Sequence, residues 1–135
     1  MTGEVTKQIL VIDDDEGIRK LLMKVFKFSG LVAVTAANGQ EGLSFVRQNK
    51  EKIGCVFLDL NMSGMDGYDT FEHLRKINNE LPVVIITGQN RKTVCETFRE
   101  NKPFDFVFKP FTISEIMSVT DRIFCKKQLI NQGAM

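Results

Sequence analysis

The stretch Ile53–Gly67, with the sequence IGCVFLDLNMSGMDG, is the starting point for interpreting the whole chain. Its apolar run, Cys55–Leu58, ends abruptly at the carboxylate Asp59, and a loop rich in Asn, Ser, Gly and Asp follows. A short apolar run bounded by turn residues predicts a strand buried on both faces, as found in parallel sheets covered by helices. Ligands of such folds bind beyond the carboxyl ends of the strands. We therefore predict that Asp59 is a site residue, with a loop-capping Asp as the alternative.

Four further short runs of apolar, mostly β-branched residues are spaced along the chain, with segments of helical periodicity after them. The further strands are expected at 9–12, 31–36, 83–86 and 104–108. Helices are expected at a segment carrying Ile18–Phe26, at 39–50, at a segment carrying Tyr68–Ile77, at 91–100, and from Thr112 or Ser114 onward. Strands and helices that alternate at this spacing predict right-handed crossovers. The expected fold is therefore α/β, a doubly wound (βα)5 sandwich of three layers around a parallel five-stranded sheet.

The length of 135 residues is enough for one domain with a single substantial core, for which we expect the boundaries 8–126. Residues 1–7 are interpreted as an N-terminal tail, and 127–135 as a C-terminal tail or the start of a linker. The 18 Lys and Arg residues nearly balance the 17 Asp and Glu residues, without a basic stripe. We therefore expect no direct binding to nucleic acid.

The sequence contains no apolar run close to the roughly 20 residues that span a bilayer, and its N-terminal segment lacks an apolar signal region. We therefore expect no membrane association and a cytoplasmic location. The three cysteines, Cys55, Cys95 and Cys125, are an odd number without metal-type spacing. We expect them to be reduced, packed side chains.

Polar side chains follow four of the predicted strands: Asp13 and Asp14 the first, Asp59 the third, Thr87 the fourth and Lys109 the fifth. Because the carboxyl ends of parallel strands lie on one edge of a sheet, we expect these side chains to converge. Three carboxylates at close range need a counter-charge, which Lys109 and a divalent cation can supply. An all-oxygen pocket suits Mg²⁺, with Mn²⁺ as the alternative, whereas the lack of nearby His or Cys argues against zinc.

A carboxylate in such a pocket can act as a nucleophile towards phosphorus. Phosphoryl transfer depends mainly on positioning and on neutralising oxygen charge. Mg²⁺ and Lys109 would neutralise the phosphoryl oxygens, and the Thr87 hydroxyl would donate a hydrogen bond to them. The residues therefore predict a site for phosphoryl chemistry at Asp59.

Four motifs, in their order along the chain, are similar to those of a known family. The chain resembles, over nearly its whole length, the receiver domain of two-component response regulators, whose fold is that of the chemotaxis regulators. The matching pieces are ILVIDDDEGIR at 9–19, VFLDLNMSGMDG at 56–67, VVIITG at 83–88 and FVFKPF at 106–111. The resemblance implies the flavodoxin-like strand order 2-1-3-4-5.

The resemblance also assigns roles around the metal and the phosphoryl group. Asp13 and Asp14 match the acidic pair that holds Mg²⁺, and Asp59 matches the phosphoacceptor, which is also a metal ligand. Asn61 matches the position whose backbone carbonyl completes the metal site. The extra acid, Asp15, is expected to cap the first helix.

Further matches concern switching and the lifetime of the phosphorylated state. Thr87 matches the switch hydroxyl, Lys109 the phosphate-binding lysine and Phe106 the aromatic switch position. The resemblance implies that Asn61 and Gln89, on either side of the phosphoryl site, tune hydrolysis. The peptide bond from Lys109 to Pro110 matches one that is usually cis in the family.

The chain departs from the family pattern at Ser63, where the family usually has Pro four residues after the phosphoacceptor. Proline presets φ and removes a hydrogen-bond donor, so Ser63 is expected to loosen this loop without abolishing phosphorylation.

The function that follows is that of a signalling switch. The resemblance implies a phosphoryl group accepted on Asp59 in a Mg²⁺-dependent reaction, from a sensor histidine kinase, a phosphotransfer protein or a small phosphodonor. The face of the fourth helix, fifth strand and last helix would then change and control an output partner or domain. Catalysis is expected only on the protein's own phosphorylation and dephosphorylation. Phosphorylation-dependent homodimers are common in the family, but no residue pattern here fixes one.

Two other classes of function stay open from the sequence. A phosphorylation-independent pseudo-receiver would be a protein-binding module, but such modules usually lose an acidic or Lys position, and none is lost here. A Mg²⁺-dependent phosphatase would need a substrate pocket and further acid–base residues. The sequence does not identify the kinase or the output, nor whether the chain is a stand-alone regulator or a part of a longer one.

Overall fold

The computed structural model describes the backbone of residues 7–62, 64 and 66–133, and side chains as far as Phe124. The expected N-terminal tail, except its last residue, lies outside the described residues. The same holds for Ser63 and for the side chain of Cys125.

Across the described residues, five parallel strands and five helices alternate, as predicted. The sheet has the strand order β2-β1-β3-β4-β5, which confirms the doubly wound fold and the flavodoxin-like order. The strands are β1 Gln8–Ile12, β2 Val32–Ala36, β3 Ile53–Asp59, β4 Val83–Thr87 and β5 Asp105–Phe108. The helices are α1 Glu16–Phe28, α2 Gly39–Gln48, α3 Gly67–Ile77, α4 Arg91–Thr97 and α5 Ile113–Gly133.

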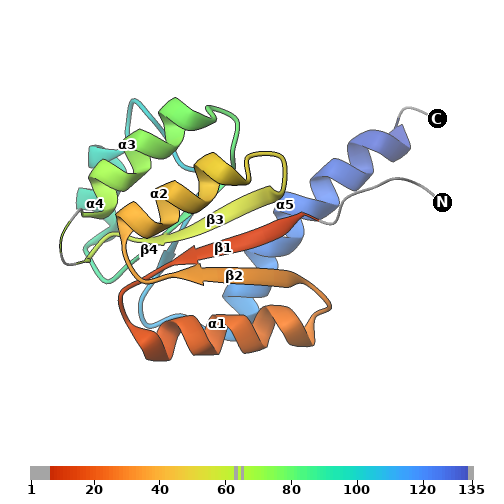
Figure 1. The fold of residues 1–135 in the computed structure, drawn as a ribbon, viewed down its shortest axis with the longest axis horizontal. Helices are drawn as coiled ribbons and strands as arrows, with labels where there is room; N and C mark the ends of the chain where they lie inside the picture. The colour runs from red at the N-terminus through yellow and green to blue at the C-terminus, as the bar shows by residue number, and fades with distance from the viewer. Residues whose placement is uncertain (1–6, 63, 65, 134–135) are drawn as a thin grey trace.

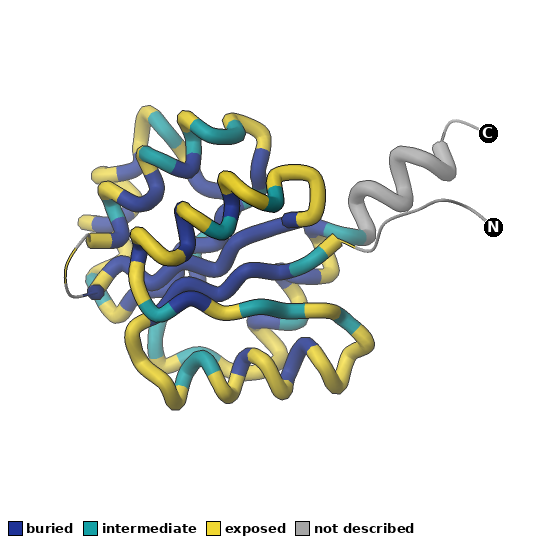
Figure 2. Tube along the Cα trace, viewed as in Figure 1, coloured by how far each residue is buried: buried dark blue, intermediate teal, exposed yellow. Residues whose placement is uncertain are grey.

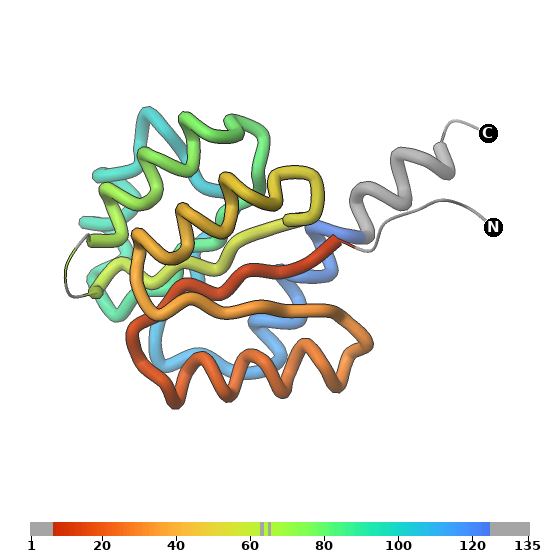
Figure 3. The backbone as a smooth tube through the Cα atoms, viewed as in Figure 1, coloured from red at the N-terminus to blue at the C-terminus, as the bar shows by residue number. Residues whose placement is uncertain are grey.

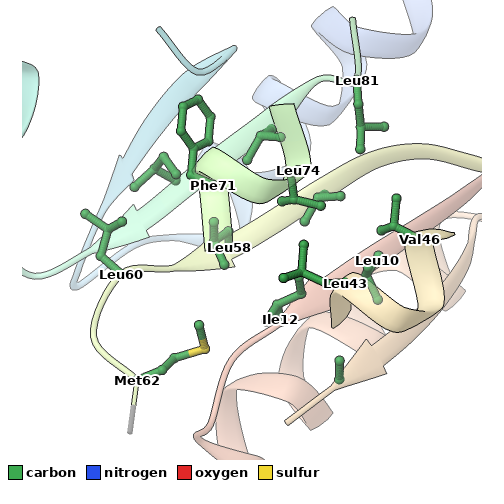
Figure 4. Close-up of a cluster of buried hydrophobic side chains, with 14 of the residues drawn as sticks. Leu10, Ile12, Leu43, Val46, Leu58, Leu60, Met62, Phe71, Leu74 and Leu81 are labelled. Carbon is green, nitrogen blue, oxygen red and sulfur yellow. The ribbon is translucent and has the colours of Figure 1, made fainter. Parts of the chain in front are cut away.

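Figure 1 shows the three layers of the fold, and two hydrophobic clusters, one on each face of the sheet, hold these layers together. Side chains alternate between the faces along β1, so Ile9 and Val11 join one cluster while Leu10 and Ile12 join the other. Helices α1 and α5 cover the first face, and α2, α3 and α4 cover the second. Figure 4 shows the second cluster, in which apolar residues of α2 and α3 point at those of β1 and β3.

Strand β3 is the centre of the molecule, and all seven of its residues are buried (Figure 2). The strand pairs with β1 on one side and β4 on the other, and helices cover both of its faces. This explains why its sequence is a continuous apolar run instead of an alternating one. The edge strand β2, by contrast, exposes Val32 and Thr35.

The ends of several elements differ from the prediction by a few residues. The second strand begins at Val32 instead of Leu31, because Leu31 ends the turn after α1 with its N–H bonded to the Phe26 carbonyl. Helix α4 ends at Thr97, three residues early, and its one buried residue is Val94. The last helix begins at Ile113 after Thr112, whose hydroxyl accepts from the Glu115 N–H.

The cysteine prediction is partly wrong. Cys55 is buried in β3 as expected, and Cys95 is a free thiol. Cys95 is exposed because α4 turns mainly Val94 towards the core.

The backbone of α5 continues to Gly133, past the expected domain boundary at 126, so that boundary stays a prediction. Figure 3 traces the described chain from β1 to the first part of α5. Among the described residues, none of the helices combines the length and the apolar character that a membrane span needs.

Candidate functional site

The site lies at the edge where the parallel strands end. The register aligns these ends: Ile12 pairs with Leu58, and Asp59 with Ile86. Thr87 in turn pairs with Phe108 on β5. The residues that immediately follow or end these strands are Asp13, Asp59, Thr87 and Lys109, so the sheet itself brings them together, as the sequence predicted.

Three carboxylates form the acidic part of the site. One oxygen each of Asp13, Asp14 and Asp59 lies within 4.8 Å of the others. Asp13 and Asp59 are 0% and 1% exposed, whereas Asp14 faces solvent. The sheet therefore holds two carboxylates in its interior and a third at the rim.

Backbone groups fix the orientation of the two buried carboxylates. Asp15 donates its N–H to Asp13 Oδ1 at 2.9 Å, and Asn61 donates its N–H to Asp59 Oδ1 at 3.2 Å. Asp15 also caps α1, because its own carboxylate accepts from the N–H groups of Gly17 and Ile18. This confirms the capping role predicted for it.

Burial, with a smaller contribution from the nearby carboxylate of Asp59, raises the pKa of Asp13 to about 6. The hydrogen bond from Asp15 and the charge of Lys109 act in the opposite direction. Asp13 Oδ2 is buried and has no hydrogen-bond partner among the described residues. A buried oxygen in this condition normally has a ligand, because an unsatisfied polar group is costly.

These residues fit a divalent cation that prefers oxygen. The donor set consists of carboxylates, and the orphaned Asp13 oxygen lies in the same cluster as Asp59. In proteins, Mg²⁺ is usually bound through one or two carboxylates, with water molecules in the remaining coordination positions. The cluster also lacks the His or Cys ligands typical of zinc.

Lys109 supplies the positive charge of the site. Its Nζ lies 3.5 Å from Asp59 Oδ1, and its side chain is 30% exposed while that of Asp59 is 2% exposed. The Lys109 N–H donates to the Thr87 carbonyl at 2.8 Å, which ties β5 to β4 at the site. The peptide bond from Lys109 to Pro110 is cis, as the family resemblance predicted.

Thr87 is fully buried at the end of β4, and its hydroxyl accepts from the Gln89 N–H at 3.0 Å. Phe106 is half-buried on β5, with its ring centroid 5.8 Å from that of Phe98 and 6.0 Å from that of Phe108. The two predicted switch residues are therefore on neighbouring strands, but Phe106 packs into an aromatic row and not onto the carboxylates.

Asn61 and Gln89 are joined directly. The Gln89 side-chain amide donates to Asn61 Oδ1 at 2.9 Å, so the loops after β3 and β4 are linked across the mouth of the site. The hydroxyl of Tyr68 donates to Gln89 Oε1 at 3.2 Å and extends this chain of hydrogen bonds into α3.

Sequence reasoning missed two residues that support the site. Tyr68 was assigned only to the apolar face of α3, although its phenol carries a polar end that a buried ring often uses. Arg19 donates from its guanidinium to the Asp13 carbonyl at 2.8 Å and so holds the acidic loop. The sequence feature that could have indicated this contact is the position of Arg19 near the start of α1, soon after the acidic residues.

Gly67 allows α3 to start close to the site. A Cβ at this position would lie 2.4 Å from Leu60 Cα and 2.6 Å from the Asp59 carbonyl oxygen, closer than side-chain atoms pack. The Gly67 N–H donates to the Leu60 carbonyl at 3.1 Å. The glycine therefore lets the helix lie directly against the chain that carries Asp59.

A flavodoxin-like sheet with acidic residues and a lysine gathered at its carboxyl edge defines the receiver class of α/β protein. Comparison with known families agrees, because residues 9–121 match the response regulator receiver domain. The chain belongs to this family, the receiver domains of two-component response regulators.

Similar proteins include sporulation initiation phosphotransferase F of Bacillus subtilis (strain 168), 34% identical over 112 residues, which is 83% of this chain and 89% of that protein. Transcriptional regulatory protein GlrR of Escherichia coli (strain K12) is 35% identical over 76% of this chain, which spans 22% of GlrR. The solved receiver domain of NtrX from Brucella abortus has 30% identity and a TM-score of 0.77, with 85% of this chain and 96% of that chain covered.

Proposed function

We propose that this domain is a phosphorylation-dependent switch that accepts a phosphoryl group on Asp59. The observation that carries the proposal is the meeting of Asp13, Asp14 and Asp59 within 4.8 Å, beside a lysine amine 3.5 Å from Asp59. Buried like charges destabilise a fold, so their presence is a sign of function. Membership of the receiver family supports the same role.

In the reaction, an oxygen of the Asp59 carboxylate attacks the phosphorus of the donor, and the bond from phosphorus to the donor atom breaks. The neighbouring hydrogen bond from the Asn61 N–H holds the Asp59 carboxylate in place. Lys109 neutralises charge on the phosphoryl oxygens, and the Thr87 hydroxyl donates to them.

The carboxylates of Asp13, Asp14 and Asp59 and the backbone carbonyl of Asn61 would hold Mg²⁺, or Mn²⁺ in its place. When bound, the ion supplies charge neutralisation for the carboxylates and the phosphoryl group. Arg19 supports this ligand set by holding the Asp13 carbonyl.

Phosphorylation would reach the surface through Thr87 and Phe106. A dianion on Asp59 attracts the Thr87 hydroxyl, and its inward movement frees space into which the Phe106 ring can rotate. The face formed by α4, β5 and α5 then changes. Both arrangements must already be populated, since a ligand only shifts an existing equilibrium.

The partners we propose are a histidine kinase or phosphotransfer protein on one side and an effector protein or domain on the other. Helix α1 is a suitable docking surface for the donor, because it starts two residues after Asp14 and exposes Leu21 and Met23. Homodimerisation through the α5 face is a family property that we regard as an outcome to be measured.

The test is incubation with acetyl phosphate and Mg²⁺, followed by mass spectrometry of the intact protein. We expect a gain of one phosphoryl group in the wild type and none in Asp59→Asn. Asp66→Asn is the matched control, because Asp66 is an exposed carboxylate in the same loop and its cap on α3 survives the change.

Two results would contradict the proposal. Failure of the wild type to gain a phosphoryl group, or to bind Mg²⁺, would favour a phosphorylation-independent binding module. Sustained turnover of an unrelated phosphate ester would favour a Mg²⁺-dependent phosphatase.

A further inference from the structure

Three polar side chains form a continuous bridge over the mouth of the site. Tyr68 donates its hydroxyl to Gln89 Oε1 at 3.2 Å, and Gln89 donates its amide to Asn61 Oδ1 at 2.9 Å. Both amide residues are also tied by their backbones to site side chains, Asn61 to Asp59 and Gln89 to Thr87. The bridge therefore connects three separate elements around the phosphoacceptor.

Tyr68 is the fixed end of this bridge. It lies in the first turn of α3 and is half-buried, with its ring stacked on that of Phe98 at a centroid distance of 5.3 Å and an angle of 15°. Phe98 is buried and also contacts the rings of Phe71 and Phe106. The aromatic packing holds the phenol in one place, so its hydroxyl can orient the side-chain amide of Gln89.

We propose that Tyr68 is a positioning residue that lengthens the life of the phosphorylated state by holding Gln89 and Asn61 to each other. This inference rests on the proposed phosphorylation of Asp59. It goes beyond the two amide residues by assigning their orientation to a third residue, in a different element.

The chemistry at stake is hydrolysis of the acyl phosphate. The oxygen of a water molecule attacks phosphorus, the bond from phosphorus to the Asp59 oxygen breaks, and the products are the Asp59 carboxylate and dihydrogen phosphate. The attacking water needs an acceptor for one of its hydrogens. Asn61 and Gln89, whose backbones are tied to Asp59 and Thr87, carry side-chain amide oxygens, and each oxygen already accepts a hydrogen bond within the bridge.

Loss of the Tyr68 hydroxyl releases Gln89 Oε1 and weakens the hold of Gln89 on Asn61. Both amide oxygens then become better acceptors for the attacking water. Since one hydrogen bond between neutral groups is at stake, we expect Tyr68→Phe to speed hydrolysis about three- to tenfold. Tyr68→Phe keeps the ring and its stacking on Phe98, so the fold is retained.

The experiment measures the decay of the acyl phosphate after the phosphodonor is removed, in Mg²⁺, for four proteins. These are the wild type, Tyr68→Phe, Gln89→Ala and the double variant. We expect Tyr68→Phe to accelerate decay in the wild-type background and to have no further effect in Gln89→Ala. A merely structural role of Tyr68 would give the same acceleration in both backgrounds.

Thr97→Val is the matched control. Like Tyr68→Phe it removes one hydroxyl, but the Thr97 hydroxyl lies at the end of α4. The Thr97 hydroxyl donates to the Thr93 carbonyl within the helix and takes no part in the bridge. This variant should decay at the wild-type rate.

The inference is overturned if Tyr68→Phe decays at or below the wild-type rate, or if its effect persists in Gln89→Ala. If the wild type accepts no phosphoryl group, the proposed function fails separately. The bridge is then judged by hydrogen exchange of the Gln89 side-chain amide. Faster exchange in Tyr68→Phe than in Thr97→Val supports the bridge, and equal exchange overturns it.

Discussion

The interior of β3 and the end of the same strand bury opposite kinds of side chain, apolar ones in the interior and a charged one at the end. From Ile53 to Leu58 the strand buries apolar atoms against helices on both faces, and its last residue, Asp59, buries a carboxylate equally deeply. Two other buried polar residues of the described chain, Thr70 and Thr120, donate their hydroxyls to backbone carbonyls four residues earlier. Asp13 instead leaves Oδ2 without a hydrogen-bond partner among the residues that the structure describes. Burial stabilises the fold in the strand interior, whereas at the strand end it costs stability and creates a site.

The largest effect is expected for the strand interior. Phe57→Ala removes a fully buried ring that packs against Phe26 and should lower the free energy of unfolding by about 3–5 kcal/mol. Phe28→Ala is the matched control, because Phe28 is 96% exposed and its loss should cost little. Urea unfolding curves measure both changes. Equal destabilisation of the two variants would contradict the burial of β3.

The next effect concerns the join between β3 and α3. Gly67→Ala places a methyl group 2.4 Å from Leu60 Cα, so the loop after β3 must move, at a cost of about 1–3 kcal/mol. The Cβ of Gly88→Ala would lie 3.9 Å from Lys109 Cβ, an ordinary contact, and this variant should be close to neutral. If thermal unfolding gives the same midpoint for both variants, α3 does not pack closely against this loop.

At the strand end the sign of the effect should reverse. Asp13→Asn removes one of two buried like charges, so without Mg²⁺ it should raise stability by about 1–2 kcal/mol. Asp14→Asn, which changes an exposed carboxylate, should have a smaller effect. Both proteins are compared by urea unfolding in the presence of a chelator. A destabilised Asp13→Asn would show that this carboxylate is well accommodated without a cation.

The smallest effect on stability is expected for Lys109→Ala, because the Lys109 side chain is partly exposed and such pairs contribute less than about 1 kcal/mol. Its effect should instead be on signalling. The affinity for Mg²⁺ should stay within about twofold of the wild type, since the positively charged Lys109 amine does not coordinate a metal cation. Phosphorylation, however, should no longer change the face formed by α4, β5 and α5. Amide chemical shifts of that face measure the change. Wild-type shift changes on phosphorylation of the variant would contradict this role.

The order of apolar runs and helical segments along the chain made most of the fold predictable. The continuous apolar run before Asp59 indicates a central strand, and the helical periodicity between runs indicates crossovers that force a parallel sheet. Once the sheet is parallel, the meeting of Asp13, Asp59 and Lys109 follows from topology, which is why the acidic cluster was predictable without coordinates.

Features that depend on how a side chain is turned were not predictable. The Tyr68 hydroxyl reaches Gln89 because the ring stacks on Phe98, a contact between residues 30 positions apart in the sequence. Cys95 lies in a predicted helix and was expected to be packed, but it is exposed, because the short α4 buries Val94 instead. Helical periodicity is weak over so few residues, and it could not fix the rotation of α4.

The most direct test of the account is a thermal unfolding series in MgCl₂, with NaCl of equal ionic strength as the reference. If the buried carboxylates form a cation site, Mg²⁺ at ten times its dissociation constant should stabilise the wild type by about 1.4 kcal/mol beyond the salt reference, or a few degrees in Tm. This gain should disappear in Asp13→Asn. An equal response to both salts in the wild type, or an undiminished gain in Asp13→Asn, would contradict the central claim.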